Sequence, residues 1–139
     1  MRIEKAYHGW GADFGVEYTM FDAGLNGFVD KSRDNLIGAD QFKIQARSQP
    51  EWRFVRLIVD SDDADPLPGD PILVNNECVG YVTSACMGYR IDQCVALGYV
   101  ENRVPEDVED FEVVVVGVNL EACLSKSAFY DPDHSRCKV

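Results

Sequence analysis

The chain has 139 residues, the size of one ordinary domain, and 46% of them are hydrophobic, which is enough to build a core. Thirteen basic residues stand against 24 acidic ones, so the formal net charge is −11. A charge of this sign repels phosphate backbones and anionic lipid surfaces, and we therefore predict no nucleic-acid partner and no membrane association. The sequence has no apolar run of about 18 residues, which predicts no membrane-spanning helix.

The first ten residues, MRIEKAYHGW, lack the apolar core of a signal peptide. We expect a cytoplasmic protein, or a mitochondrial matrix protein if the source is eukaryotic. The chain starts abruptly with charged and aromatic residues, and we interpret this start as the cut edge of something longer. Trp10 lies between two glycines, and we expect its side chain in the core.

The N-terminal part of the chain predicts a mixture of short helices and extended segments. Thr19 and Asp22 have the spacing of a capping box, and residues 25–29 predict a short strand. Residues 39–47 predict a helix, because apolar side chains four residues apart share a face. A proline then ends this helix, and we place a boundary near residues 49–50.

From Trp52 onward, short strand-like runs alternate with turns, a pattern typical of a small β-barrel or sandwich. The run WRFVRLIVD alternates large apolar and basic residues, which indicates a half-buried strand. The stretch T-S-A-C-M-G-Y at residues 83–89 indicates a turn region between two strands. The predicted strands cover residues 52–60, 71–74, 78–83, 93–101, 111–117 and 120–125.

The five cysteines show no metal or disulfide pattern. Their number is odd, their spacing is irregular and no C-x-x-C occurs, so we expect buried, reduced thiols. The two histidines, His8 and His134, lie at opposite ends of the chain. The acidic stretch at residues 60–70 lacks the spacing of a calcium-binding loop and favours a solvated turn. We therefore predict no metal ligands.

The motifs of common catalytic sites are missing from the sequence. There is no G-x-S-x-G, no phosphate-binding loop and no H-E-x-x-H. The residues by themselves indicate a binding or structural portion, and no catalytic residue is assigned.

Several stretches resemble one known family when they are taken in order. They are R-I-E-K-A-Y-H-G-W-G-A-D, E-Y-T-M-F-D-A-G-L, F-V-D-K-S-R-D-N-L-I-G, V-G-Y-V-T-S-A, A-L-G-Y-V and F-Y-D-P-D-H-S-R. This order resembles the folate-dependent aminomethyltransferases, the family of the glycine cleavage T-protein. The form E-K-A-Y-x-x-W-G, with Y-D-P near the end, is most similar to the C-terminal part of dimethylglycine and sarcosine dehydrogenases.

The resemblance implies two structural parts. Residues 1–48 would be an α+β remnant that finishes the middle, folate-binding domain, and residues 50–139 would form a small C-terminal antiparallel β-barrel. The implied cofactor is tetrahydrofolate, and the implied substrate is a small methylated amine. FAD would belong only to an upstream domain that this chain lacks. The family's catalytic Asp lies in a further missing domain, so we expect this chain alone to be inactive.

The resemblance also implies residues that bind the cofactor. Glu4 matches a glutamate that binds the pterin ring, whose amino group and ring N–H suit a carboxylate. Arg33 matches an arginine near the folate tail, where a guanidinium suits a carboxylate. Near the end, the family pattern has a folate-contacting Tyr, and here Arg136 stands at about that position. We name Glu4, Arg33 and Arg136 as candidate folate-binding residues.

Three functions remain open at this point. The chain is the folate-binding part of an enzyme like dimethylglycine or sarcosine dehydrogenase or the glycine cleavage aminomethyltransferase. Alternatively, it is a non-catalytic folate-binding or structural module that works with a separate partner chain. A third alternative is a relative with the same fold that acts on another methyl donor, such as a sulfonium demethylase.

Overall fold

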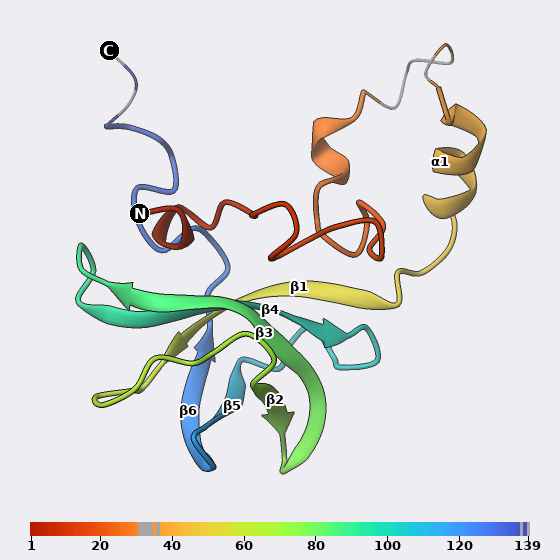
Figure 1. The fold of residues 1–139 in the computed structure, drawn as a ribbon. Coiled ribbons are helices and arrows are strands. Elements are labelled where there is room, and N and C mark those ends of the chain that lie inside the picture. Colours follow the sequence, from red (N-terminus) through yellow and green to blue (C-terminus); the bar gives the residue numbers. More distant parts are fainter. Residues whose placement is uncertain (31–34, 36, 137, 139) are drawn as a thin grey trace.

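The computed structural model describes residues 1–30, 35, 37–136 and 138. Within these residues, six antiparallel strands close into a barrel in the order β1-β4-β3-β2-β5-β6 (Figure 1). The strands are β1 (Trp52–Val59), β2 (Pro71–Val74), β3 (Glu77–Gly88), β4 (Gln93–Glu101), β5 (Asp110–Val115) and β6 (Val118–Leu124). The predicted antiparallel barrel is therefore confirmed.

The barrel core is built from the inward-facing positions of these strands. On β1, Val55, Leu57 and Val59 point inward and are buried, as expected for a strand with a side-chain period of two. The wider core is aliphatic with one aromatic ring, and it also contains Ile72, Val79, Val82, Cys94, Ala96, Val100, Val104, Phe111, Val113, Val115 and Ala122.

Strand β4 is buried on both of its faces. Seven consecutive residues of β4 are buried. Three of them, Cys94, Ala96 and Val100, belong to the barrel core. Tyr99 packs outside the barrel, where its ring stacks on Tyr18 with centroids 4.0 Å apart. The N-terminal segment (residues 1–30) crosses this outer face, as Figure 1 shows in red and orange. Because this segment covers the outer face of β4, both faces of the strand are buried, which explains why its sequence is a nearly continuous apolar run.

The N-terminal segment consists mainly of turns and single-turn helices. Its regular pieces are η1 (Ile3–Lys5) and η2 (Asn26–Phe28), and the chain then enters the helix α1 (Ala39–Gln45). The helix predicted over residues 39–47 is confirmed. The strand predicted over residues 25–29 is wrong, because these residues form a 3₁₀ turn closed by local backbone hydrogen bonds.

The predicted capping-box pair at Thr19 and Asp22 is confirmed. The backbone N–H of Thr19 donates to Asp22 Oδ2 at 2.9 Å, and the backbone N–H of Asp22 donates to Thr19 Oγ1 at 3.1 Å. Asp22 Oδ1 also accepts from the backbone N–H of Trp52 at 3.0 Å. The same side chain therefore closes a local turn and ties the N-terminal segment to the start of β1.

Three expectations about particular segments need correction. The stretch at residues 83–89 is strand up to Gly88, because it pairs with β4 along its length, and the turn comes at residues 89–92. Trp10 is 70% exposed and does not enter the core. Of the cysteines, Cys94 is buried, but Cys78 and Cys123 are exposed free thiols. Cys137 lies outside the described residues.

Candidate functional site

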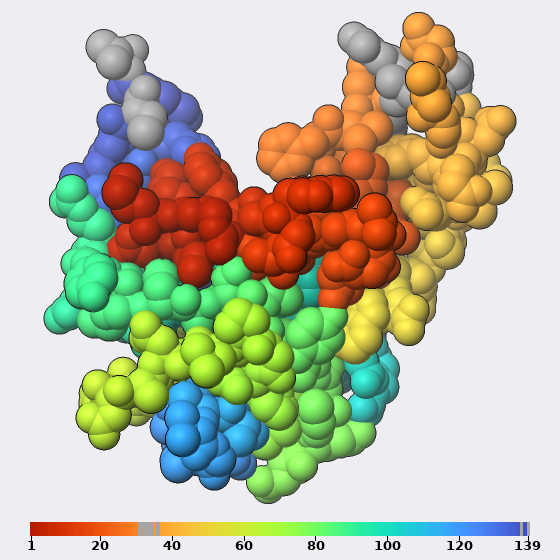
Figure 2. Space-filling view, in the orientation of Figure 1, coloured from red at the N-terminus to blue at the C-terminus, as the bar shows by residue number. Residues whose placement is uncertain are grey.

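A cavity of about 370 Å³ lies where three distant parts of the chain meet. These parts are η1, the β3–β4 turn (residues 89–92) and the C-terminal tail (residues 125–136), and they adjoin on one side of the molecule in Figure 2. We call this cavity the Glu4 pocket. It is lined by Met1, Glu4, Lys5, Tyr7, Arg90, Tyr130, Asp131 and Arg136.

Glu4 is the buried carboxylate of this pocket, and only 4% of its surface is exposed. The backbone N–H of Arg90 donates to Oε1 at 2.8 Å, and the terminal amino group of Met1 lies 3.2 Å from Oε2. The hydrogen bond from Arg90 lowers the pKa of Glu4 and outweighs the burial that acts to raise it. Glu4 is therefore an ionised acceptor at neutral pH.

The C-terminal tail closes one side of the pocket through contacts with η1. The backbone N–H of Tyr130 donates to the carbonyl oxygen of Glu4 at 2.9 Å. Lys5 Nζ donates to the backbone oxygen of Asp131 at 2.7 Å and lies 3.2 Å from its carboxylate. Tyr7 stacks on His134 with ring centroids 6.2 Å apart. The tail is thus fixed to the N-terminal segment by backbone, ionic and aromatic contacts.

Two cations flank one aromatic ring in the pocket. The guanidinium carbon of Arg90 lies 6.0 Å from the centroid of the Tyr130 ring, and that of Arg136 lies 5.5 Å away. Such distances are within the range of cation–π attraction. Because the cations lie near the rim and the carboxylate of Glu4 is buried, the pocket offers both charges to a ligand.

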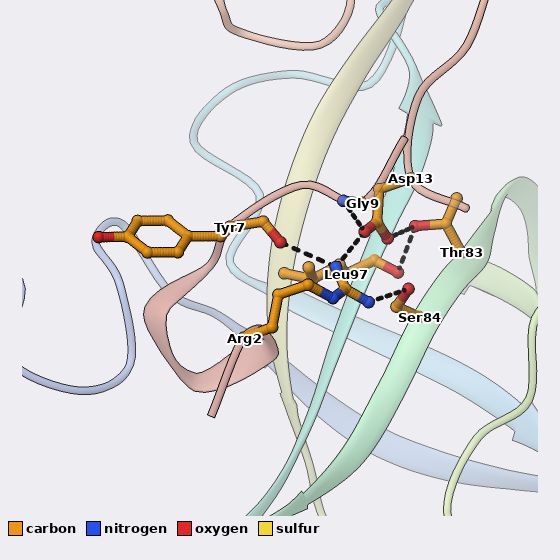
Figure 3. Close-up of polar contacts among 7 residues, drawn as sticks. All are labelled: Arg2, Tyr7, Gly9, Asp13, Thr83, Ser84 and Leu97. Carbon is orange, nitrogen blue, oxygen red and sulfur yellow. Dashed lines mark hydrogen bonds and ion pairs between the residues drawn. The ribbon is translucent and has the colours of Figure 1, made fainter. Parts of the chain in front are cut away.

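A buried ionic network beside the pocket fixes the N-terminal segment to the barrel (Figure 3). Asp13 is fully buried and accepts from Thr83 Oγ1 and from the backbone N–H of Gly9, each at 2.7 Å. Arg2 also pairs with Asp13, and its other nitrogen donates to Ser84 Oγ at 2.9 Å. Burial acts to raise the pKa of Asp13, but the hydrogen bonds from Thr83 and Gly9 outweigh it and hold that pKa below its usual value. The network positions Arg2, which is two residues before Glu4.

The structure brings together two of the three residues singled out in the sequence. Glu4 and Arg136 line the same pocket although they lie at opposite ends of the chain. Arg33 lies outside the described residues. Sequence reasoning missed Arg90 and Tyr130. Tyr130 is in the quoted F-Y-D-P stretch, but Arg90 is a turn residue with no motif of its own, so its place in the pocket follows only from the tertiary fold.

Two other kinds of feature are absent from the described residues. No group of three or more His, Cys, Asp or Glu side chains is arranged to hold a metal ion there. Among the same residues, no helix has the length and apolar composition needed to cross a membrane.

The carboxyl group of Asp131 is expected to titrate near pH 2. Burial acts to raise its pKa, but hydrogen bonds from Ser135 and Lys5 outweigh this and lower the pKa from 3.8 to about 2. A lowered pKa means that the contribution of Asp131 to tail docking is complete above about pH 4 and is lost as the pH falls towards 2. The carboxyl ¹³C shift of Asp131, followed by NMR from pH 6 to 1.5, measures the midpoint.

Ser135→Ala should raise that midpoint, because it removes a donor to the carboxylate at 2.9 Å. Ser127→Ala is the control, since the Ser127 hydroxyl contacts the backbone of Ala128 and not Asp131. An unchanged midpoint in Ser135→Ala would show that this hydrogen bond does not form in solution.

The described elements define a class of protein: a closed antiparallel barrel whose outer face carries a packed N-terminal segment. The family model of the Glycine cleavage T-protein C-terminal barrel domain matches residues 53–131, more than half of the chain. The chain belongs to this family.

Individual relatives extend the similarity beyond the barrel. Dimethylglycine dehydrogenase, mitochondrial, of Mus musculus is 28% identical over 140 residues, covering all of this chain. An aminomethyltransferase of Prochlorococcus marinus (strain MIT 9313) is 31% identical over 131 residues, or 94% of this chain. The chain spans only 16% of the first relative and 35% of the second.

A solved structure shares the fold. The glycine cleavage system aminomethyltransferase T from Bartonella henselae superposes with a TM-score of 0.81 at 24% identity. The match covers 94% of this chain and 37% of that one. The shared fold therefore includes most of the N-terminal segment as well as the barrel.

Proposed function

We propose that this chain is the tetrahydrofolate-binding part of a one-carbon transfer enzyme that acts on methylated amines. The observation that carries this proposal is Glu4: a buried, ionised carboxylate in a pocket, within a chain of the glycine cleavage T-protein family. The relatives named above are a dimethylglycine dehydrogenase and an aminomethyltransferase, which supports an amine as the one-carbon donor.

The residues of the Glu4 pocket fit a reduced folate. Glu4 Oε1 accepts from the backbone N–H of Arg90, and the carboxylate has further lone pairs for nitrogen donors of the kind that a pterin ring presents. Tyr130 offers an aromatic face, and Arg136 offers a cation for a carboxylate. When bound, tetrahydrofolate supplies the nitrogen atoms that accept the one-carbon unit. The residues of this chain bind and orient it.

In this proposal, residues 1–48 complete a middle folate-binding domain and residues 50–139 form the barrel that supports it. Several large apolar side chains in the described portion of this first part face solvent, among them Val16, Phe28, Ile37 and Ile44, which are between 60% and 107% exposed. Exposed apolar groups of this size are unfavourable in water, and we infer that further domains cover them, on the same polypeptide or on a partner chain.

The remaining chemistry belongs to those further domains. They would provide the catalytic acid or base, the amine site and, in a dehydrogenase-type protein, the FAD. We accordingly assign no catalytic residue and no FAD contact to this chain. We place the protein in the cytoplasm, or in the mitochondrial matrix of a eukaryote. A module without catalysis, or a sulfonium demethylase, would use the same Glu4 pocket and differ in those domains.

Replacing Glu4 is the test of the proposed folate site. Glu4→Gln keeps the shape but removes the charge, and charge-assisted hydrogen bonds are worth about 1.5–3 kcal/mol each. We expect affinity for 5-formyltetrahydrofolate to fall at least about tenfold in the complete protein, meaning this chain with any further domains or partner chain. Isothermal titration calorimetry measures the change.

Glu106→Gln is the matched control, because Glu106 is exposed on the loop between β4 and β5 and does not line the pocket. Lys5→Gln is a poorer control, since Lys5 holds the tail through Asp131. Equal affinities in the Glu4 and Glu106 variants would refute the proposed site. The isolated chain should bind the folate weakly, and sub-micromolar binding by it would mean that the site is placed wrongly.

A further inference from the structure

The β3–β4 turn lines the Glu4 pocket and also binds Glu4 through its main chain. Within the turn, the backbone N–H groups of Ile91 and Asp92 both donate to the carbonyl oxygen of Gly88, at 3.1 and 2.8 Å. The N–H of Arg90 instead leaves the turn and donates to Glu4 Oε1. The turn is therefore anchored to η1 through the main chain of Arg90, and this anchor leaves the Arg90 side chain free for another role.

The guanidinium of Arg90 lies in the pocket, where its charge acts on Glu4 only at a longer range than an ion pair. Its ring contact is Tyr130, which it shares with Arg136. Among the described residues, neither guanidinium forms an ion pair with a carboxylate. Glu4 accepts from the backbone N–H of Arg90, and Asp131 pairs with Lys5 and accepts from Ser135, so neither carboxylate of the pocket forms an ion pair with the two guanidinium groups.

Among the described arginines, Arg2 and Arg103 pair with carboxylates. Arg53 and Arg56 donate to backbone carbonyl oxygens. The guanidinium groups of Arg90 and Arg136 have neither kind of partner within the described residues and contact only the Tyr130 ring. Two like charges around one ring repel each other, and a single ring compensates this only partly. An anionic group beside the Tyr130 ring would relieve this repulsion, since a guanidinium pairs with carboxylate oxygens through parallel hydrogen bonds.

We propose that Arg90 is a folate-binding residue that, together with Arg136, holds the carboxylate end of the ligand beside Tyr130. This inference rests on the proposed function, and it assigns a role in specificity. Glu4 recognises the pterin ring, whereas the arginine pair recognises the p-aminobenzoylglutamate portion. The aromatic part of that portion can pack against the Tyr130 ring. The barrel, through one turn, then selects a complete folate over a pterin that has no acidic tail.

Two ligands and three variants of the complete protein test this division. The ligands are 5-formyltetrahydrofolate and 6-methyltetrahydropterin, which has the ring but no p-aminobenzoylglutamate. Arg90→Gln keeps the backbone N–H that binds Glu4, so only the guanidinium is removed. We expect it to weaken the folate about tenfold, the loss of one charge-assisted hydrogen-bonded contact, and to leave pterin affinity unchanged. Calorimetry or competition binding measures both affinities.

The other two variants separate the possible failures. Glu4→Gln should weaken both ligands, and Arg47→Gln should weaken neither, because Arg47 is exposed after α1 and outside the pocket. If Arg90→Gln binds the folate like the unaltered protein, or loses both ligands equally, the role of Arg90 is overturned while the Glu4 site stands. If Glu4→Gln has no effect, or neither ligand binds the unaltered protein, the proposed function fails and the inference fails with it.

A spectroscopic readout checks the same contact without any variant. The side-chain Nε–H resonances of Arg90 and Arg136 in the ¹⁵N-labelled complete protein should shift when p-aminobenzoylglutamate is added at millimolar concentration. Addition of 6-methyltetrahydropterin should leave the Nε–H resonances in place. Shifts that follow the pterin alone would contradict the assignment of the arginines to the acidic tail.

Discussion

Gly80→Ala is expected to lower the free energy of unfolding by about 3 kcal/mol or more, the cost of forcing atoms into a packed backbone. A Cβ at this position would lie 1.9 Å from the carbonyl oxygen of Tyr99 and 2.8 Å from the Cα of Val100. Both are main-chain atoms of β4, and Gly80 is paired with Val100 in the β3–β4 ladder. The clash therefore cannot be relieved by a side-chain rotation and must separate the two strands.

The matched control is Gly27→Ala. An added Cβ at Gly27 has no heavy atom within 4 Å. We expect its stability to stay within about 1 kcal/mol of the unaltered chain. Urea unfolding followed by tyrosine and tryptophan fluorescence measures both variants. Equal stabilities would mean that β3 and β4 do not approach as closely in solution as they do here.

Asp13→Ala is expected to destabilise the chain by about 3 kcal/mol, because it leaves buried partners without an acceptor. The removed carboxylate accepts from Thr83 Oγ1 and Gly9 N–H and pairs with Arg2. Arg2 is 40% exposed, so water compensates part of its loss, whereas Thr83 is buried. The effect should be concentrated where the N-terminal segment meets the barrel.

Urea unfolding and amide hydrogen exchange together locate this effect. Exchange in residues 2–14 should accelerate in Asp13→Ala more than exchange in β5, which lies away from the network. Asp107→Ala is the control, since Asp107 is exposed on a loop. A loss of stability spread evenly over the barrel, or no loss at all, would contradict the role given to Asp13.

Much of the barrel was predictable because its strands follow local rules. Strand β2 and strand β4 have the predicted bounds, and the chain turns after β2 at Asn75 and Asn76, whose φ angles are 51° and 63°. The length of β3 was not predictable. Its small and polar residues at positions 83 to 86 are typical of a turn. They form a strand because they pair with β4 and contact the N-terminal segment.

The candidate site was predictable only in part. The resemblance to the aminomethyltransferases pointed to Glu4 and Arg136, and the structure places both at one pocket. Arg90 and Asp13 could not be found from their neighbours in sequence. Their partners lie 86 and 70 residues away, in contacts that exist only after the N-terminal segment has packed against the barrel.

The orientation of Trp10 also depends on what surrounds the chain. A tryptophan between glycines was expected in the core, yet its side chain is 70% exposed and packs edge-on against Phe14. Burial there would require atoms that the described residues of this chain do not contribute. This agrees with our proposal that further domains or a partner chain cover the outer side of the N-terminal segment.

The central claim is that Glu4 binds the ring of a reduced folate. The most direct measurement is an experimental structure of the complete protein with 5-formyltetrahydrofolate bound. We predict that the pterin amino group and a ring N–H donate to the Glu4 carboxylate at hydrogen-bond distance, with Glu4 still accepting from the backbone N–H of Arg90. A folate bound elsewhere, with Glu4 contacting only protein atoms, would contradict this account.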